Sequence, residues 1–297
     1  MRTLLKILYD KLFRLFVKFK LIRSKIFYVK DKKVFFHRIK DNNLLINISI
    51  NGFESHENEV IKLIKNYHWS LEEFYDIGSN VGHYASIVNL FHENTSVTAV
   101  EPFPLNANYI RELKANNDFS FAIVEKAVDH HSGEIKKFFF PVSTKSSKLP
   151  GTGTLINSFK GSGGIFNDLP YKEIKVETIS LDDLIGQSSK NSLIKIDCEG
   201  NEYNIINKSK ILERDNVDFI VEIMINDLDK NDIFYVMKKH GFNGYLITNA
   251  GLVREDRPLT LPKPNRHDRT QWRNHFFTKK PLSEIENFSK SHYGYWI

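Results

Sequence analysis

The amino-acid sequence predicts an α/β protein with a mostly parallel sheet and helices on both faces. From residue 71 onward, short apolar segments alternate with amphipathic ones, as strands and helices alternate in such sheets. Glycines punctuate the turn after the first strand, and acidic residues follow two later strands. The single cysteine, Cys198, excludes an internal disulfide and a multi-cysteine zinc site, and it favours a reducing, cytoplasmic setting.

The N-terminal extension, residues 1–45, holds the positive charge of the chain. Residues 1–40 contain thirteen Lys and Arg against two Asp, a net charge of +11, so the total of +6 leaves −5 for the remaining 257 residues. A general nucleic-acid binder is expected to carry its basic stripe on the folded body. The charge distribution therefore disfavours nucleic acid as a partner.

Residues 1–28 predict a basic amphipathic helix, because apolar residues recur at steps of three and four between lysines and arginines. No stretch approaches the 18 uncharged apolar residues of a membrane span, and charges interrupt any signal-peptide core. Two alternatives stay open. The helix lies on an anionic membrane surface, or its apolar stripe packs on the body.

The body is expected to form one domain over residues 46–280, followed by a C-terminal tail at 281–297. Its short apolar runs predict strands, and its longer periodic segments predict helices. The strands are expected at 71–77, 96–100, 119–128, 192–197, 217–223, 242–248 and 271–278. The helices are expected at 82–91, 103–115, 202–212 and 230–240. Residues 141–171 lack periodicity and contain five glycines, so they form an irregular insertion of the kind that acts as a lid or binding loop.

The turn from Asp76 to Gly82 is the first candidate site. Gly78 allows a tight turn close to a ligand, Asn80 lies between the glycines, and Gly82 lets the helix pack near the strand. The spacing is Gly-x-x-x-Gly rather than the Gly-x-Gly-x-x-Gly of dinucleotide sites. Asp76 adds negative charge at the mouth of the turn, which suits a cationic amino group or sulfonium better than a pyrophosphate.

Acidic residues follow two further strands. Glu101 ends the next strand, where a carboxylate can accept both ribose hydroxyls of an adenosine, and Pro102 then turns the chain away. Asp197 and Glu199 follow the strand at 192–197 and are expected in the same crevice. The nearby Glu202 is better explained as a cap on the next helix.

Four segments together resemble the FkbM family of methyltransferases, over roughly residues 72–278. They are Asp76 to Gly82, Val100-Glu101-Pro102-Phe103-Pro104-Leu105-Asn106, Ile179-Ser180-Leu181-Asp182-Asp183-Leu184, and Ile194-Lys195-Ile196-Asp197-Cys198-Glu199-Gly200. Asn201 departs from the usual Ala, and residues 1–45, the insertion and the chain after Thr278 lie outside the resemblance.

The resemblance implies a class I, Rossmann-like fold of seven strands with the last one antiparallel, and S-adenosylmethionine as methyl donor. It also implies methylation of a hydroxyl, commonly on a sugar, a glycan precursor or a related metabolite. Matched residue by residue, Asp76, Gly78, Asn80 and Gly82 fall on the methionine loop. Glu101, followed by Pro102, falls on the ribose-binding acid, and Asp197 with Glu199 on the Asp-x-Glu-Gly motif.

An alcohol needs help to lose its proton, so a base is expected beside the transferred methyl group. Asp197 or Glu199 is the first candidate, acting directly or through a divalent cation, and Glu222 and His83 are weaker ones. No dedicated metal site is assigned. Two alternatives to a methyltransferase are an NAD(P)-dependent oxidoreductase, which lacks its usual glycine spacing here, and a non-enzymatic binding module attached to the membrane by the basic N-terminus.

Overall fold

The computed structural model describes residues 2–18, 22–142, 149–156, 170–224, 232–257 and 272–293. Its centre is an eight-stranded sheet with the order β12-β11-β13-β10-β9-β3-β4-β5. The strands are β3 (Glu73–Ile77), β4 (Ser96–Val100), β5 (Ala122–Val124), β9 (Ser192–Ile196), β10 (Val217–Met224), β11 (Asn243–Thr248), β12 (Gly251–Arg254) and β13 (Trp272–Thr278).

The strand directions confirm a mostly parallel α/β sheet. β3 pairs in parallel with β4 and β9, and β10 continues in parallel from β9. β13 is antiparallel to both of its neighbours. The main sheet has a strand within each of the seven expected segments, and β12 adds an eighth, paired antiparallel with β11 at the edge. Its four residues follow a tight turn and are too short to show an apolar pattern.

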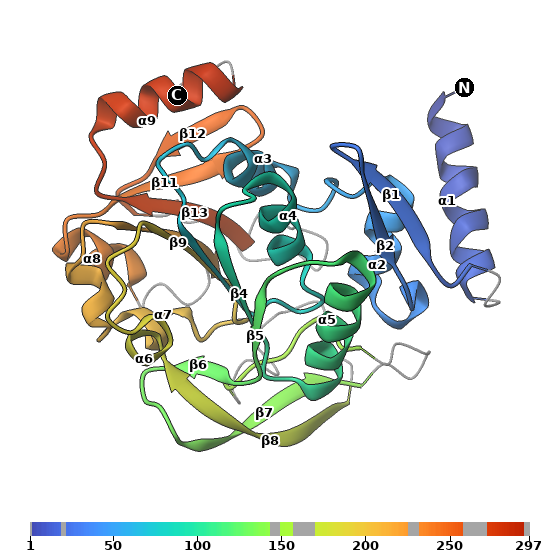
Figure 1. Ribbon diagram of the computed structural model, residues 1–297, viewed down its shortest axis with the longest axis horizontal. Helices are drawn as coiled ribbons and strands as arrows, with labels where there is room; N and C mark the ends of the chain where they lie inside the picture. Colours follow the sequence, from blue (N-terminus) through green and yellow to red (C-terminus); the bar gives the residue numbers. More distant parts are fainter. Residues whose placement is uncertain are drawn as a thin grey trace.

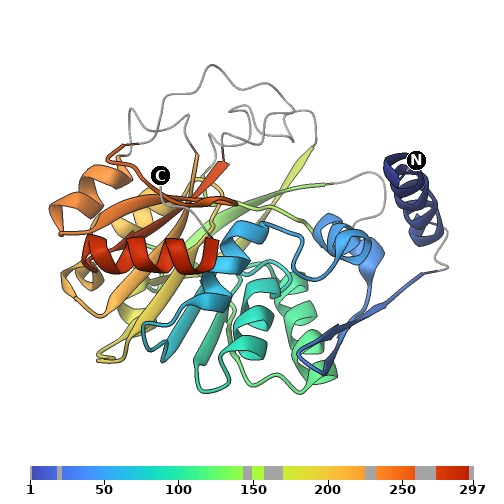
Figure 2. The same ribbon diagram turned by 90° about the horizontal axis from the view of Figure 1, so that it is seen from above.

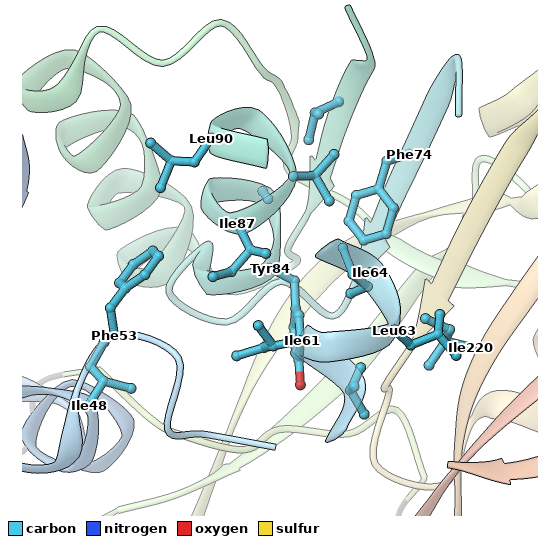
Figure 3. Close-up of a cluster of buried hydrophobic side chains, with 14 of the residues drawn as sticks. Ile48, Phe53, Ile61, Leu63, Ile64, Phe74, Tyr84, Ile87, Leu90 and Ile220 are labelled. Carbon is cyan, nitrogen blue, oxygen red and sulfur yellow. The ribbon is translucent and has the colours of Figure 1, made fainter. Parts of the chain in front are cut away.

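Alternate side chains of the strands build two separate cores. On one face, Phe74 and Ile220 pack with helices α3 (Asn58–Asn66), α4 (His83–Phe91), α5 (Pro104–Asn117) and α9 (Leu282–Tyr293). Figure 3 shows the centre of this core, with side chains from α3, α4 and β3 gathered in one cluster. On the other face, Tyr75 and Phe219 pack with α6 (Leu181–Ile185), α7 (Glu202–Ile206) and α8 (Ile233–Lys239). Helices therefore cover both faces, as Figure 1 shows.

The strand expected at 119–128 is wrong as a single element. It is divided between β5 of the main sheet and β6 (Ala127–Asp129) of a second, three-stranded sheet. β6 pairs in parallel with β8 (Tyr171–Ser180), which is antiparallel to β7 (Ile135–Pro141). β7 and β8 flank the expected insertion, and residues 149–156 return along β7 through a bridge between Phe139 and Thr154. The rest of the insertion lies outside the described residues.

The N-terminus is shorter as a helix than expected. α1 (Arg2–Lys18) ends before a hairpin of β1 (Lys25–Val29) and β2 (Lys32–Phe36), so residues 25–28 form a strand instead. A 3-10 turn, η1 (Ile39–Asp41), and α2 (Asn43–Asn51) then lead to α3. Figures 1 and 2 place α1 at the edge of the molecule, beside the hairpin and away from the main sheet. Within the described residues, no helix has the length and apolar character to cross a bilayer.

Two further expectations differ in detail. The helix expected at 202–212 is divided into α7 and a 3-10 turn, η3 (Lys210–Glu213). Of the helix expected at 230–240, the structure describes α8, which begins at Ile233. The segment expected as a tail contains α9, whose Ile285 and Phe288 are buried in the first core. Ser289 also accepts a hydrogen bond from the Leu252 amide, which attaches α9 to β12.

Candidate functional site

The carboxyl ends of β3, β4 and β9 meet at the centre of the sheet. The chain proceeds from β3 toward one edge and from β9 toward the other, so this is the point where α/β folds bind ligands. A cavity opens here, and its lining includes residues from the ends of all three strands. This is the usual place of a small-molecule or cofactor site in such sheets.

Backbone geometry makes Gly78 the most constrained residue of the turn after β3. Its φ is +82°, and a Cβ there would lie 1.9 Å from the backbone oxygen of Asp197. The Gly78 and Ser79 amides both donate to the Val100 carbonyl at 3.0 Å, which ties the turn to the end of β4. Asn80 is left-handed at a φ of +53° and lines the cavity. The turn thus brings bare backbone to the ligand space.

Asp76 does not lie at the mouth of the turn, contrary to the sequence-based expectation. Its side chain is 1 % exposed, lies behind the cavity wall, and accepts a hydrogen bond from the Ala85 amide at 3.0 Å. Burial raises the pKa of Asp76 to about 6, although Lys195 and this amide oppose the shift. Gly82 also lies outside the wall, with a φ of +73°, as the residue that begins α4. Both residues shape the turn from behind.

Glu101 lies on the cavity wall, as expected, and its orientation is fixed. Its Oε2 accepts from the Asn80 amide at 2.8 Å and its Oε1 from the Phe103 amide at 2.9 Å. Burial raises the pKa of Glu101 to about 8, while the two amides oppose the shift. Each oxygen has a second lone pair, and a ligand hydroxyl that donates to it would favour the charged form, as the two amides do. Glu101 is therefore suited to a pair of ligand hydroxyls, and Pro102 lines the wall beside it.

Asp197 lies on the same wall and is held by a buried lysine. Lys195 is 1 % exposed, and its Nζ lies 2.9 Å from Asp197 Oδ2 and 4.5 Å from the ring centroid of Tyr84. Burial works against an ionised Asp197, but Lys195 outweighs it and lowers the pKa of this carboxyl. Burial and then Asp197 raise the pKa of Glu222, which hydrogen-bonds Asp197. Asp197 is thus the ionised acid of the group.

Glu199 lines the cavity in a strained backbone. Its φ is +51°, a conformation that side chains rarely adopt without a compensating constraint. Its Oε2 is buried, and no described residue hydrogen-bonds it. Burial, followed by the charge of Asp197, raises the pKa of Glu199. Glu202 begins α7, and its Oε1 accepts from the amides of Cys198 at 2.8 Å and Gly200 at 3.2 Å in the turn before that helix, rather than forming the expected helix cap.

His83 is buried beside the turn and is neutral. Its Nε2 donates to the Phe53 carbonyl at 2.7 Å, and burial lowers the pKa of His83 to about 3. Across the described residues, no group of three or more His, Cys, Asp and Glu side chains is arranged to hold a metal ion.

Sequence reasoning missed the residues that the N-terminal segment brings to the site. His56 and Leu44 line the cavity, and the Glu57 carboxylate accepts from the Tyr84 hydroxyl. The pairing of Lys195 with Asp197 was also not predicted. One signal for it is present in the sequence: Lys195 lies in the middle of an apolar strand, and buried lysines are rare unless they are paired with an acid. His56 carried no signal at all.

These features fit S-adenosylmethionine. A glycine turn gives close backbone approach, a fixed carboxylate suits a ribose diol, and the ionised Asp197 suits a ligand that carries positive charge.

A family model identifies the family of this chain. A family model described as "Methyltransferase FkbM domain" matches residues 76–243. Among curated proteins, no match was found.

Solved structures similar to this chain include precorrin-6y C5,15-methyltransferase from Geobacter metallireducens, at 14 % identity, covering 75 % of this chain and 89 % of that one with a TM-score of 0.38. Another is the ribosomal protein L11 methylase of Lactobacillus delbrueckii, at 11 % identity, 76 % and 80 % coverage and a TM-score of 0.37. The N-terminal domain of human METTL16 in complex with SAH has 11 % identity, 77 % and 70 % coverage and a TM-score of 0.37.

The family match replaces the two alternatives weighed from the sequence, an oxidoreductase and a non-enzymatic binding module. Because the matched region spans more than half of its 297 residues, the chain belongs to the FkbM family of methyltransferases and is an enzyme that uses S-adenosylmethionine.

Proposed function

We propose that the enzyme transfers the methyl group of S-adenosylmethionine to a hydroxyl of a sugar, a glycan precursor or a related metabolite. The observation that carries this proposal is the ionised Asp197 on the cavity wall, with Lys195 Nζ 2.9 Å from its carboxylate. A hydroxyl must lose a proton as its oxygen attacks carbon. A fixed negative charge favours that loss, either by accepting the proton or by stabilising the cation that does.

Within this proposal, Gly78, Asn80, Glu101 and Pro102 contact the cofactor, because all four line the cavity. Asp76 and Gly82 support them by shaping the turn. Asp197 and Glu199 lie on the acceptor side as the catalytic carboxyl groups. Burial raises the pKa of Glu199, which favours a role as hydrogen-bond donor over a role as base.

The test is incubation with methyl-labelled S-adenosylmethionine and a panel of sugar nucleotides, glycolipid precursors and free glycans. We expect the label in a methyl ether that survives mild base and gives a methoxy carbon signal by NMR. Asp197→Asn should bind S-adenosylhomocysteine with unchanged affinity by calorimetry and lose turnover about 100-fold or more. Asp215→Asn, at a carboxylate that is 93 % exposed, is the matched control with wild-type turnover. Label on nitrogen, or in a base-labile ester, would contradict hydroxyl methylation.

A divalent cation is a separate question, and the proposed chemistry does not require one. If a cation bridges Asp197 to the acceptor, a chelator will abolish label transfer and Mg²⁺ will restore it. We expect transfer to be unchanged by the chelator, because Lys195 already supplies the positive charge beside Asp197.

We also propose that α1 rests on an anionic membrane surface. Leu8, Leu12 and Leu15 form one stripe and are 54, 43 and 44 % exposed. Phe13, on another side of the helix, is 5 % exposed and faces the body. The stripe therefore does not pack on the described part of the chain, as the second sequence-based alternative required. An exposed apolar stripe on a basic helix suits the boundary between acidic headgroups and acyl chains.

Vesicle sedimentation tests this contact. The full chain should sediment with vesicles of phosphatidylcholine and phosphatidylglycerol at low salt, and Leu12→Glu should reduce the bound fraction several-fold. Tyr235→Glu is the matched control, because Tyr235 is also an exposed apolar residue, at 66 %, but lies on α8. Equal sedimentation of the two variants would refute the role of α1. The cytoplasmic location expected from the single cysteine stays a prediction.

A further inference from the structure

His56 lies in the turn between α2 and α3, before the region that the family model matches. The turn is attached to α4 on both sides of His56. The Phe53 carbonyl accepts from His83 Nε2 at 2.7 Å, and the Glu57 carboxylate accepts from the Tyr84 hydroxyl. Phe53 itself is 4 % exposed in the first core. These anchors fix the turn, and with it His56, against the helix that follows the cofactor turn.

The anchored turn brings His56 to the cavity wall that also contains Asp197 and Glu199. The His56 ring centroid lies 6.2 Å from that of His83. His56 is partly exposed, and its ring has no hydrogen-bond partner among the residues that the structure describes. An imidazole on the wall of a substrate cavity is available to contact a bound molecule.

The other titratable groups of the cavity are poorly suited to receive a proton from an alcohol. Asp197 is ionised, but Lys195 stabilises its charged form and so weakens it as a base. Burial, followed by the charge of Asp197, raises the pKa values of Glu199 and Glu222 and so favours their protonated forms. His83 is buried, with one ring nitrogen already bonded. Histidine is the commonest general base in enzymes.

We propose that His56 receives the proton of the acceptor hydroxyl, while the ionised Asp197 stabilises the imidazolium that forms. This inference rests on the proposed O-methyl transfer and names its proton acceptor. In the step, the acceptor oxygen bonds to the methyl carbon, and the carbon–sulfur bond breaks with its electron pair left on sulfur. The hydroxyl proton goes to a ring nitrogen of His56 and later passes to water.

Several titratable groups lie on or behind the same wall as His56. They come from its own turn, from α4 and from the region of β9 and β10, and they are Glu57, His83, Tyr84, Lys195, Asp197, Glu199 and Glu222. Asp197 is the ionised one that shares the cavity wall with His56. Its negative charge is therefore the one that can stabilise an imidazolium at this position.

The first experiment needs no acceptor. In protein labelled with ¹³C-histidine and saturated with S-adenosylhomocysteine, the His56 signals are assigned by their loss in His56→Gln and compared between wild type and Asp197→Asn at one pH. We expect Asp197→Asn to move the His56 ring signals and to leave those of the exposed His131 in place. Unchanged His56 signals would overturn the pairing of His56 with Asp197.

The second experiment uses the acceptor found with labelled cofactor. His56→Gln should lower kcat/KM about 100-fold or more, with S-adenosylhomocysteine affinity kept within twofold. His131→Gln, at an exposed ring away from the cavity, is the matched control. A His56→Gln enzyme within twofold of wild type would overturn the proposal while leaving hydroxyl methylation intact. A wild-type enzyme that methylates no hydroxyl would instead refute the proposed function.

Discussion

Replacing Gly78 by Ala tests whether the cofactor turn needs bare backbone. The φ of +82° makes any side chain unfavourable there by about 1–2 kcal/mol. The added Cβ would also lie 1.9 Å from the Asp197 carbonyl oxygen, where real Cβ atoms keep at least 3.0 Å. Because that atom belongs to the backbone, β9 and the turn must separate by more than 1 Å.

The expected loss combines strain with overpacking. Overpacking of this kind destabilises by about 1–3 kcal/mol, so the sum is about 2–5 kcal/mol. For a chain of this size, that corresponds to a fall in Tm of about 5–15 °C. The separation also moves Asp197 away from the cavity, and a displacement near 1 Å can reduce turnover about 100-fold.

Gly82→Ala is the matched control. Its φ of +73° brings the same strain, but its Cβ would lie 3.3 Å from Ile110 Cγ2, a side-chain atom that can move. We expect a Tm lower by about 2–8 °C.

The assay is thermal unfolding of wild type and both variants with and without S-adenosylhomocysteine. At an S-adenosylhomocysteine concentration of 100 times Kd, the ligand should stabilise Gly82→Ala by about 2.7 kcal/mol. Gly78→Ala should lose this stabilisation. Equal melting temperatures and equal ligand shifts in the two variants would refute the close approach of Gly78 to Asp197.

Three further predictions follow from the charges of the site. Glu101→Gln should weaken S-adenosylhomocysteine about 10- to 100-fold by calorimetry, because one carboxylate oxygen becomes a donor facing a backbone amide or a ribose hydroxyl; unchanged affinity would rule out a ribose contact. Lys195→Met should raise the pKa of Asp197 and move the acid limb of the kcat profile to higher pH; a stationary limb would show that this ammonium does not hold Asp197 ionised. The native state keeps the Asp76 proton up to about pH 6, and the unfolded chain releases it near 3.8. Stability should therefore fall as pH rises through this window, by about 3 kcal/mol, and Asp76→Asn should flatten the curve measured by urea unfolding.

The parts of the fold that the sequence predicted well are those with a single strong local signal. The strand at 96–100 has the expected bounds, and the turn after β3 is where its glycines indicated. The segment 119–128 failed because its apolar residues continue across Glu125 and Lys126, where the chain leaves one sheet for another. Nothing local distinguishes one ten-residue strand from two three-residue strands in different sheets.

The candidate site was predictable where a residue follows a strand, and it was not predictable where a distant segment supplies the wall. Glu101, Asp197 and Glu199 reach the cavity because parallel strands bring their carboxyl ends together. His56 reaches it because Phe53 and Glu57 happen to meet α4, through contacts about thirty residues apart in the chain. Such contacts follow from tertiary packing and have no periodic or spacing signature.

The sequence predicted a negative charge at this site and assigned it to Asp76. The structure has a negative charge there, but it belongs to another residue. Asp76 is buried behind the turn, and the ionised acid on the cavity wall is Asp197. Glu57, Asp76, Asp197 and Glu222 all act on one buried ammonium, that of Lys195. Clustered buried acids destabilise a fold unless something positive offsets them. The sulfonium of S-adenosylmethionine would supply that charge at the wall, so this cluster favours the cofactor over a pyrophosphate.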